Sequence, residues 1–163
     1  MTLDHPMTLE QFHTLVKLMR GNLETPSNIA ARRVLIDGIP VPQATHESGK
    51  KRASVHITVN RYKKNHELVV EAFRFKGNLS GQFDLIVKLH RGNPEAPTTL
   101  AARAVLVEGV PQPEIQFEGF SPSALSQAIK RYRDAMQTVS EAYPPTVGLP
   151  KKPRRPRTPK DKV

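Results

Sequence analysis

The chain has 163 residues, a formal net charge of +10 and no cysteine. The lack of cysteine excludes disulfide bonds and thiolate zinc sites, and no apolar run approaches the roughly 20 residues that a membrane-spanning helix needs. Hydrophobic residues make up 37% of the sequence and aromatic residues only 6%, which favours small helical units over one large core. We therefore expect an all-α protein. Because the first residues lack a basic-then-apolar signal pattern, we also expect it to be cytoplasmic.

The chain contains an internal repeat. Residues 11–42 align without a gap to residues 82–113, and the alignment continues, shifted by one residue, through the helix that follows. Repeated units of this length predict two tandem domains, at residues 7–66 and 78–143, with a linker at residues 67–77. The alternative is one intertwined, pseudo-symmetric domain built from both copies.

Each copy begins with signals for two helices. Thr8 and Gln11 have the spacing of a capping box at a helix start, and Gly21 can adopt the left-handed conformation that ends a helix. A second helix follows Pro26 and ends at Asp37-Gly38. Apolar residues at helical spacing indicate core packing at Phe12, Leu15, Val16, Met19, Ile29, Ala30, Val34 and Leu35, and in the second copy at Phe83, Ile86, Val87, Leu100, Ala101, Val105 and Leu106.

A third and a fourth helix complete each copy, so that we expect about four helices in each. In the second copy Gly119-Phe120 predicts a tight turn, and Ser121-Pro122 supplies an N-cap followed by a proline at the first helical position. In the helix that follows, Leu125, Ala128 and Ile129 are expected to face inward. The residues expected to face outward are Ser123, Ser126, Gln127, Lys130 and Arg131.

The outward side chains of the fourth helix have the chemistry of base readers. Glutamine can bond adenine through two hydrogen bonds, lysine and arginine reach guanine or phosphate, and serine adapts to either. In the first copy Gly49 precedes a helix from which Arg52, His56 and Asn60 project in the same way. A polar helix face is also what any solvated helix presents, so the pattern by itself leaves both interpretations open.

Two stretches carry a resemblance to a known family. Residues 102–112, ARAVLVEGVPQ, and residues 119–131, GFSPSALSQAIKR, resemble the KorA/TrfB family of plasmid-encoded transcriptional repressors, whose stretch runs A-R-x-V-L-V-D-G-x-P-Q and then G-L-T-R-G-A-V-S-Q-A-V-x-R. The resemblance implies a helix-turn-helix fold in each copy. It also implies that the fourth helix enters the major groove of a double-stranded DNA operator while the third braces it over the backbone.

The two copies match the family's base-reading residues differently. Arg52 matches the family's arginine, where the second copy has Pro122, and Gln127 matches its glutamine, where the first copy has Ile57. One chain would then carry two unequal readers and bind an asymmetric operator as a monomeric pseudodimer, with a homodimer as the alternative. The predicted DNA-binding residues are Gln43, Lys51, Arg52, Ser54, His56, Asn60 and Arg61 in the first copy, Gln112, Ser121, Ser123, Ser126, Gln127, Lys130 and Arg131 in the second, and Lys151, Lys152, Arg154, Arg155 and Arg157 in the tail.

The tail at residues 144–163 is expected to be disordered. Its last 14 residues carry seven basic side chains and one acidic one, which is six of the ten net positive charges of the chain. Its prolines break helices, and it has too few apolar side chains to form a core. A basic arm of this kind is typical of polyanion binding, and it is also common as a solubilising end.

Two other functions compete with DNA binding. An enzyme is disfavoured because the six histidines show no metal-ligand spacing and no nucleophile stands with a base, so we expect no catalysis, metal or cofactor. The second is a protein-interaction module in which only one copy binds DNA. The apolar stretch of Leu68, Val69, Val70, Phe73 and Phe75 would pack between the copies or form an interface, and we favour packing.

Overall fold

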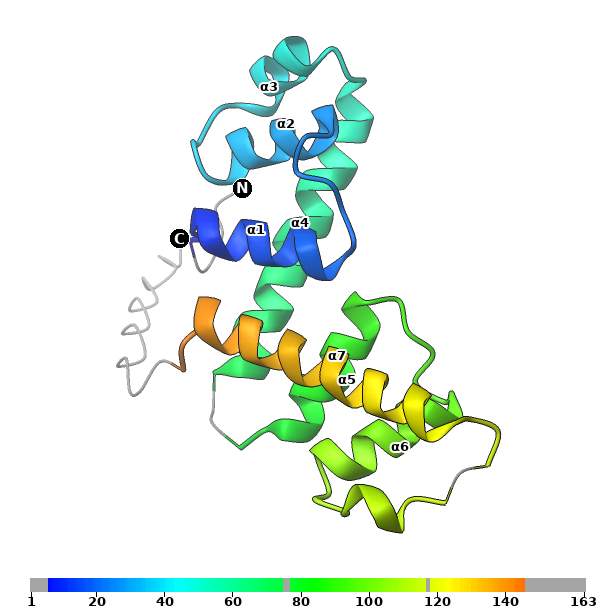
Figure 1. The fold of residues 1–163 in the computed structure, drawn as a ribbon. Helices are drawn as coiled ribbons and strands as arrows, with labels where there is room; N and C mark the ends of the chain where they lie inside the picture. The colour runs from blue at the N-terminus through cyan, green and yellow to red at the C-terminus, as the bar shows by residue number, and fades with distance from the viewer. Residues whose placement is uncertain (1–5, 75–76, 117, 146–163) are drawn as a thin grey trace, which may run out of the picture.

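The computed structural model describes residues 6–74, 77–116 and 118–145, and every regular element in those ranges is helical. The predicted all-α class is confirmed. None of these helices is both long enough and apolar enough to span a lipid bilayer. The elements are α1 (Leu9–Leu18), α2 (Pro26–Leu35), α3 (Val41–Ser48), α4 (Arg52–Phe73), α5 (Leu79–Leu89), α6 (Pro97–Leu106), the 3₁₀ helix η1 (Gln112–Glu114) and α7 (Pro122–Ala142), as Figure 1 shows.

The same succession of elements occurs twice. We call α1 to α4 the first repeat and α5 to α7, with η1, the second repeat. The predicted capping box is present, because Thr8 Oγ1 accepts the Gln11 amide at 3.2 Å and Gln11 Oε1 accepts the Thr8 amide at 2.9 Å. The predicted start of α7 is confirmed too, with Ser121 Oγ accepting the Ala124 amide at 3.2 Å and Pro122 in the first turn.

The first helix of each repeat ends differently from the sequence prediction. The left-handed residue is Arg20 (φ 52°), not Gly21. The Arg20 amide bonds Lys17 O at 3.0 Å and the Gly21 amide bonds Val16 O at 2.8 Å, which is the Schellman pattern. Glycine is needed for another reason, since a Cβ at position 21 would lie 3.1 Å from Val16 Cγ1. Arg91 (φ 54°) ends α5 in the same way.

The predicted linker is wrong over residues 67–73. These residues form the last turns of α4, in which Val69 and Phe73 are buried. No breaking residue stands before Gly77, so the apolar spacing continues the helix instead of interrupting it. α4 packs against α5, so this stretch lies between the repeats. Phe75 is outside the described residues.

Two further expectations need correction. Ile29 and its counterpart Leu100 are 38% and 52% exposed, because the buried stripes of α2 and α6 are centred on Ala31 and Ala102. The third helix of the second repeat is only the 3₁₀ turn η1. The chain between Gln112 and Gly119 is one residue shorter than its counterpart between Val41 and Gly49, which forms the eight-residue α3.

The repeats exchange contacts in a nearly two-fold arrangement. Gln11 Nε2 on α1 donates to Ala142 O at the end of α7 (3.1 Å), and its counterpart Gln82 Nε2 on α5 donates to Ala72 O at the end of α4 (3.3 Å). The last carbonyls of a helix lack partners within it, so each repeat supplies a partner for the other's long helix. The buried residues of both repeats form one hydrophobic cluster.

Candidate nucleic-acid interface

The first turns of α4 and α7 have the same exposure pattern. We call the exposed positions of residues 52–61 the α4 face and those of residues 122–131 the α7 face. The predicted inward and outward positions are confirmed, since Leu125, Ala128 and Ile129 are buried. The exposed residues are Arg52, Ala53, His56, Ile57, Asn60 and Arg61 on α4, and Pro122, Ser123, Ser126, Gln127, Lys130 and Arg131 on α7.

A buried tyrosine fixes the orientation of α4. Tyr62 Oη donates to Asn28 Oδ1 at 2.9 Å, and Asn28 Nδ2 in turn donates to Asn22 O at 2.7 Å in the loop after α1. The ring also packs against Phe12, with centroids 5.0 Å apart. Burial raises the pKa of Tyr62, with Arg61 and Asn28 acting in the opposite direction, so the phenol stays protonated at neutral pH. This bond chain holds the α4 face in a set orientation relative to α1 and α2.

The second repeat has the same tyrosine with a weaker bond. Tyr132 Oη lies 3.4 Å from Thr99 Oγ1, and the Tyr132 ring packs against Phe83 with centroids 5.0 Å apart. In both repeats the preceding arginine lies over the ring, Arg61 at 5.2 Å and Arg131 at 4.7 Å from the centroid. These cation–π contacts restrict the positions of both guanidinium groups, one at the edge of each face.

Two predicted base readers lie together in the second repeat. Gln112 Nε2 donates to Ser126 Oγ at 2.9 Å, and Ser126 Oγ donates to Pro122 O at 3.0 Å. Their counterparts in the first repeat are Val41 and His56, which line one groove of about 670 Å³. The start of the third element therefore borders the fourth helix in both repeats, but only the second repeat places an amide there.

Other predicted residues are placed less favourably. Gln43 donates a hydrogen bond to Glu47 at 3.1 Å, and Glu47 forms an ion pair with Arg33 of α2. The Gln43 side chain is therefore linked to α2 through Glu47. Ser54 is only half-exposed. Ser121 uses its hydroxyl oxygen as the cap of α7. Lys51, at the N-cap of α4, is exposed. The predicted tail residues, Lys151, Lys152, Arg154, Arg155 and Arg157, lie outside the described residues.

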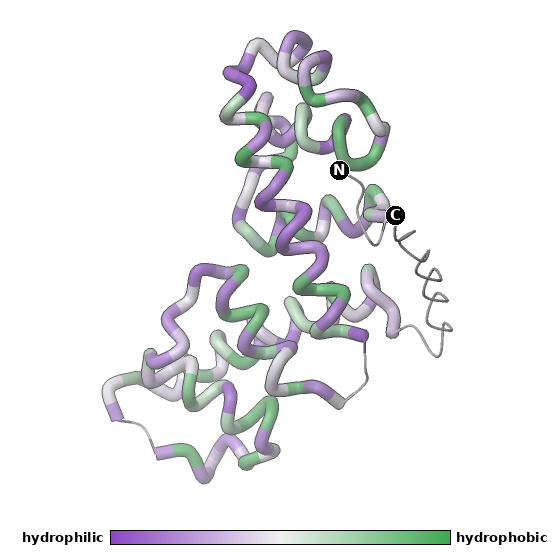
Figure 2. The backbone as a smooth tube through the Cα atoms, turned by 180° about the vertical axis from the view of Figure 1, so that it is seen from behind, coloured by the Kyte–Doolittle hydropathy of each residue, from purple (hydrophilic) through white to green (hydrophobic). Residues whose placement is uncertain are grey.

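The N-terminal halves of α4 and α7 carry basic residues and no acidic one. Residues 49–66 contain six basic residues and no acidic one, and residues 119–133 contain three basic residues and no acidic one. Figure 2 shows the hydrophilic middle of α4 as a continuous stretch. The basic residues are Lys50, Lys51, Arg52, Arg61, Lys63 and Lys64 on the first segment, and Lys130, Arg131 and Arg133 on the second. An acid-free basic surface attracts a polyanion.

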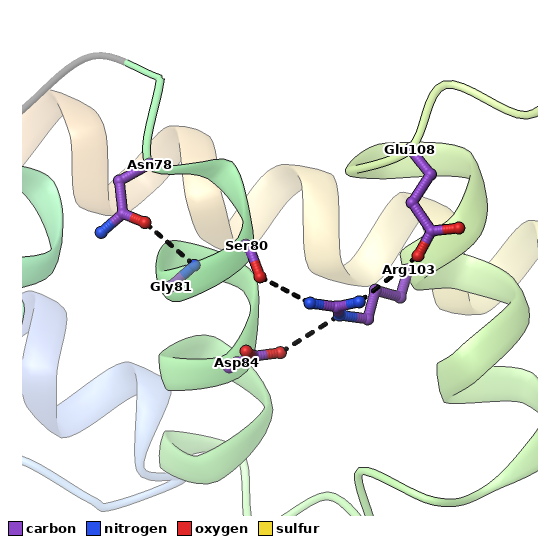
Figure 3. A network of polar contacts seen from close by, with 6 residues as sticks. All are labelled: Asn78, Ser80, Gly81, Asp84, Arg103 and Glu108. Atoms are coloured by element: carbon purple, nitrogen blue, oxygen red, sulfur yellow. Dashed lines mark hydrogen bonds and ion pairs between the residues drawn. The ribbon is translucent and has the colours of Figure 1, made fainter.

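Arg103, away from the two faces, is neutralised by acidic partners. Arg103 of α6 lies 3.4 Å from Asp84 and 3.3 Å from Glu108, and it also bonds Ser80 (Figure 3). Figure 3 shows these partners around one guanidinium, which links α5 to the C-terminal end of α6. Among the described residues, none of the arginines or lysines on the α4 and α7 faces has such an acidic partner. Arg103 is therefore structural, while the charges of the two faces remain available.

Ile57 was not among the predicted contact residues, although it is exposed on the α4 face. At 68% exposed it is the most exposed of the large hydrophobic residues in the described ranges, and it occupies the α4 position that Gln127 occupies on α7. An apolar side chain on an otherwise polar face can contact the methyl group of thymine. Its outward position in the helical pattern was the signal that could have identified it.

Arg20 and Arg91 were also missed. Burial, followed by the charges of Arg131 and Arg20, lowers the pKa of His90, so Arg20 of the first repeat lies near α5 and α7 of the second. His90 Nδ1 is buried and has no hydrogen-bond partner among the described residues. Both arginines are exposed and identical between the copies, and that identity at a surface position was the available signal.

Within the described ranges no group of three or more histidine, aspartate or glutamate side chains is placed to hold a metal ion.

In comparisons with known proteins, no family model, no curated protein and no solved structure matches this chain.

Proposed function

We propose that the chain is a sequence-specific transcriptional repressor, encoded on a plasmid or mobile element, that binds double-stranded DNA through the α4 and α7 faces. The observation that carries this proposal is the equal exposure pattern of two helix starts that hold basic residues and no acidic ones. The sequence resemblance to the KorA/TrfB family supports it independently of the structure.

In this proposal each repeat acts as a helix-turn-helix unit. α3 and α4 are joined through Gly49, Lys50 and Lys51, a turn of the length and composition typical of that motif, with Gly49 at φ 64°. In the second repeat η1 and the loop through Gly119 take the place of α3. The third element would brace the backbone while the fourth helix enters the major groove.

The separation of the two faces is compatible with one DNA helical turn. α4 and α7 meet where His66 Nδ1 and Tyr143 Oη are 3.1 Å apart. At 1.5 Å per residue, His56 lies about 15 Å from that contact along α4 and Ser126 about 25 Å along α7. Figure 1 shows α4 and α7 crossing at a steep angle, with the start of each helix far from the crossing. Their centres are therefore less than the summed distance of about 40 Å apart, a range that includes the roughly 34 Å between successive major grooves on one side of DNA.

The two faces differ in what they can read. The α4 face offers Arg52 and Ile57 where the α7 face offers Pro122 and Gln127. Arginine suits guanine and isoleucine suits the thymine methyl group, whereas glutamine suits adenine. A single chain would thus recognise an asymmetric site with two different halves.

Selection of bound duplexes from a random library tests the proposal. We expect one enriched site with two half-sites about one turn apart. Gln127→Ala should weaken binding to only one half of the selected site, by about 1 to 3 kcal/mol. Arg52→Ala should weaken binding to the other half. The matched control is Gln137→Ala, which removes an exposed amide further along α7. Absence of any enriched sequence would refute sequence-specific binding.

The second candidate is an interaction module in which one repeat alone binds DNA. It is favoured by the unequal charge of the two segments and by the reduction of the third helix to η1 in the second repeat. The same experiment distinguishes the two functions. A selected site with a single half would support the interaction module if its binding were weakened by Arg52→Ala and unchanged by Gln127→Ala.

A further inference from the structure

Arg20 and Arg91 occupy positions that are sterically unfavourable for arginine. Each ends a helix in the left-handed region, at φ 52° and φ 54°, and among the described residues they are the only ones other than glycine with positive φ. Glycine adopts this conformation without a Cβ penalty and is the usual residue at this position. Both repeats nevertheless have arginine there and place glycine one residue later.

In the described part of the chain, these arginines have no ion-pair or side-chain hydrogen-bond partner that would explain their presence. Both side chains belong to exposed residues, and within the described ranges neither forms an ion pair or a side-chain hydrogen bond. Their backbone amides make the helix-ending bonds, which any residue other than proline could make. The side chain itself is therefore the feature that needs a function, since local strain is tolerated most often at functional positions.

The two arginines lie between the α4 and α7 faces. Figure 1 shows the ends of α1 and α5 close together, between the starts of α4 and α7. The influence of Arg20 and Arg131 on the same His90 ring places charges from both repeats around this junction. By the near two-fold relation of the repeats, Arg91 belongs to the corresponding place beside α4.

A duplex spanning both faces would present backbone phosphates and the minor groove at this junction. If the two faces lie in successive major grooves, the DNA between them is the segment whose minor groove turns toward the protein. The phosphates there carry uncompensated negative charge, and arginine binds phosphate through two parallel hydrogen bonds.

We infer that Arg20 and Arg91 form a central clamp that binds backbone phosphates between the two half-sites. This inference rests on the proposed DNA-binding function and adds a contact independent of base sequence. The clamp fixes the register of the duplex across the junction, while the α4 and α7 faces discriminate bases.

The double substitution Arg20→Gly with Arg91→Gly tests the clamp, because glycine removes both charges and suits the left-handed conformation. The thermal midpoint should therefore stay the same or rise. With about 0.9 log units of affinity lost per log unit of salt for each contact, loss of two contacts should reduce the salt slope by about 1.8. Between 50 and 200 mM salt the affinity should then fall about 12-fold less than for the wild type.

The matched control is Lys17→Ala with Lys88→Ala, which removes the same charge from exposed, equivalent positions one turn earlier on α1 and α5. A second variant, Arg20→Asn with Arg91→Asn, also suits the left-handed conformation and serves if glycine disturbs folding. Phosphate ethylation interference should map the affected contacts to the centre of the selected site.

The outcomes separate the two proposals. A wild-type chain that binds no duplex would refute the proposed function and the clamp with it. A wild type that binds its selected site, with a salt slope that the arginine variants leave unchanged or lower no more than the lysine control, would refute the clamp alone.

Discussion

The bond from Tyr62 to Asn28 gives a stability prediction with an internal control. Tyr62→Phe keeps the ring packing against Phe12 and removes only the hydroxyl. Asn28 is 5% exposed, so its Oδ1 would lose its donor without gaining water. Leaving a buried acceptor unsatisfied costs about 1 to 3 kcal/mol of unfolding free energy. At about 2 to 4 °C per kcal/mol for a chain of this size, the thermal midpoint should fall by about 2 to 12 °C.

The equivalent change Tyr132→Phe should cost less, about 1 kcal/mol or below, because its hydroxyl lies 3.4 Å from Thr99. Both variants can be compared by urea unfolding followed by far-ultraviolet circular dichroism. A double-mutant cycle of Tyr62→Phe with Asn28→Ala should show coupling between the two sites. Equal losses for the two tyrosine variants, or additive effects in the cycle, would show that the Asn28 bond does not anchor α4.

Three further predictions concern pH and specificity. His90 has a lowered pKa in the folded protein, so its contribution to stability is present above pH 6.5, its ordinary pKa, and is lost as the pH falls. The variant His90→Met introduces the residue that the first repeat has at Met19. It should lose less stability than the wild type between pH 7.5 and pH 5 in urea titrations. Burial raises the pKa of Tyr143 above its ordinary value of 10.0, so stability should fall above pH 10, and Tyr143→Phe should make that fall shallower in thermal scans. Ile57→Gln should make the first half-site selected from a random library resemble the half read by Gln127, and an unchanged preference would contradict a base-reading role for position 57.

Local signals predicted the helix starts well. The capping box of Thr8 and Gln11 and the Ser121-Pro122 cap depend on residues within one turn, so their spacing in sequence determines their geometry. The buried and exposed positions of α7 followed from helical periodicity in the same way. The candidate faces were therefore visible in the sequence as soon as the helix start was known.

Features that depend on tertiary contacts were harder to predict. Gly21 was expected to be the left-handed residue, but its small size serves the approach to Val16 and Asn28, and Arg20 takes the left-handed conformation. The extension of α4 through Phe73 follows its apolar spacing, but the packing of α4 against α5 is a contact between the repeats that no local spacing shows. The Gln112 to Ser126 bond also required the fold, because the loop between them has no regular spacing.

The exchange of caps by Gln11 and Gln82 has a consequence for concentration. Two separate subunits held by such contacts would fall apart on dilution, and their occupancy of a site would depend on the square of their concentration. Here a peptide connection of a few residues joins α4 to α5, so the local concentration of one half around the other is in the millimolar range. The two repeats should therefore remain assembled at the nanomolar concentrations that a few molecules per cell give. Occupancy of a site should then rise linearly with the concentration of the protein.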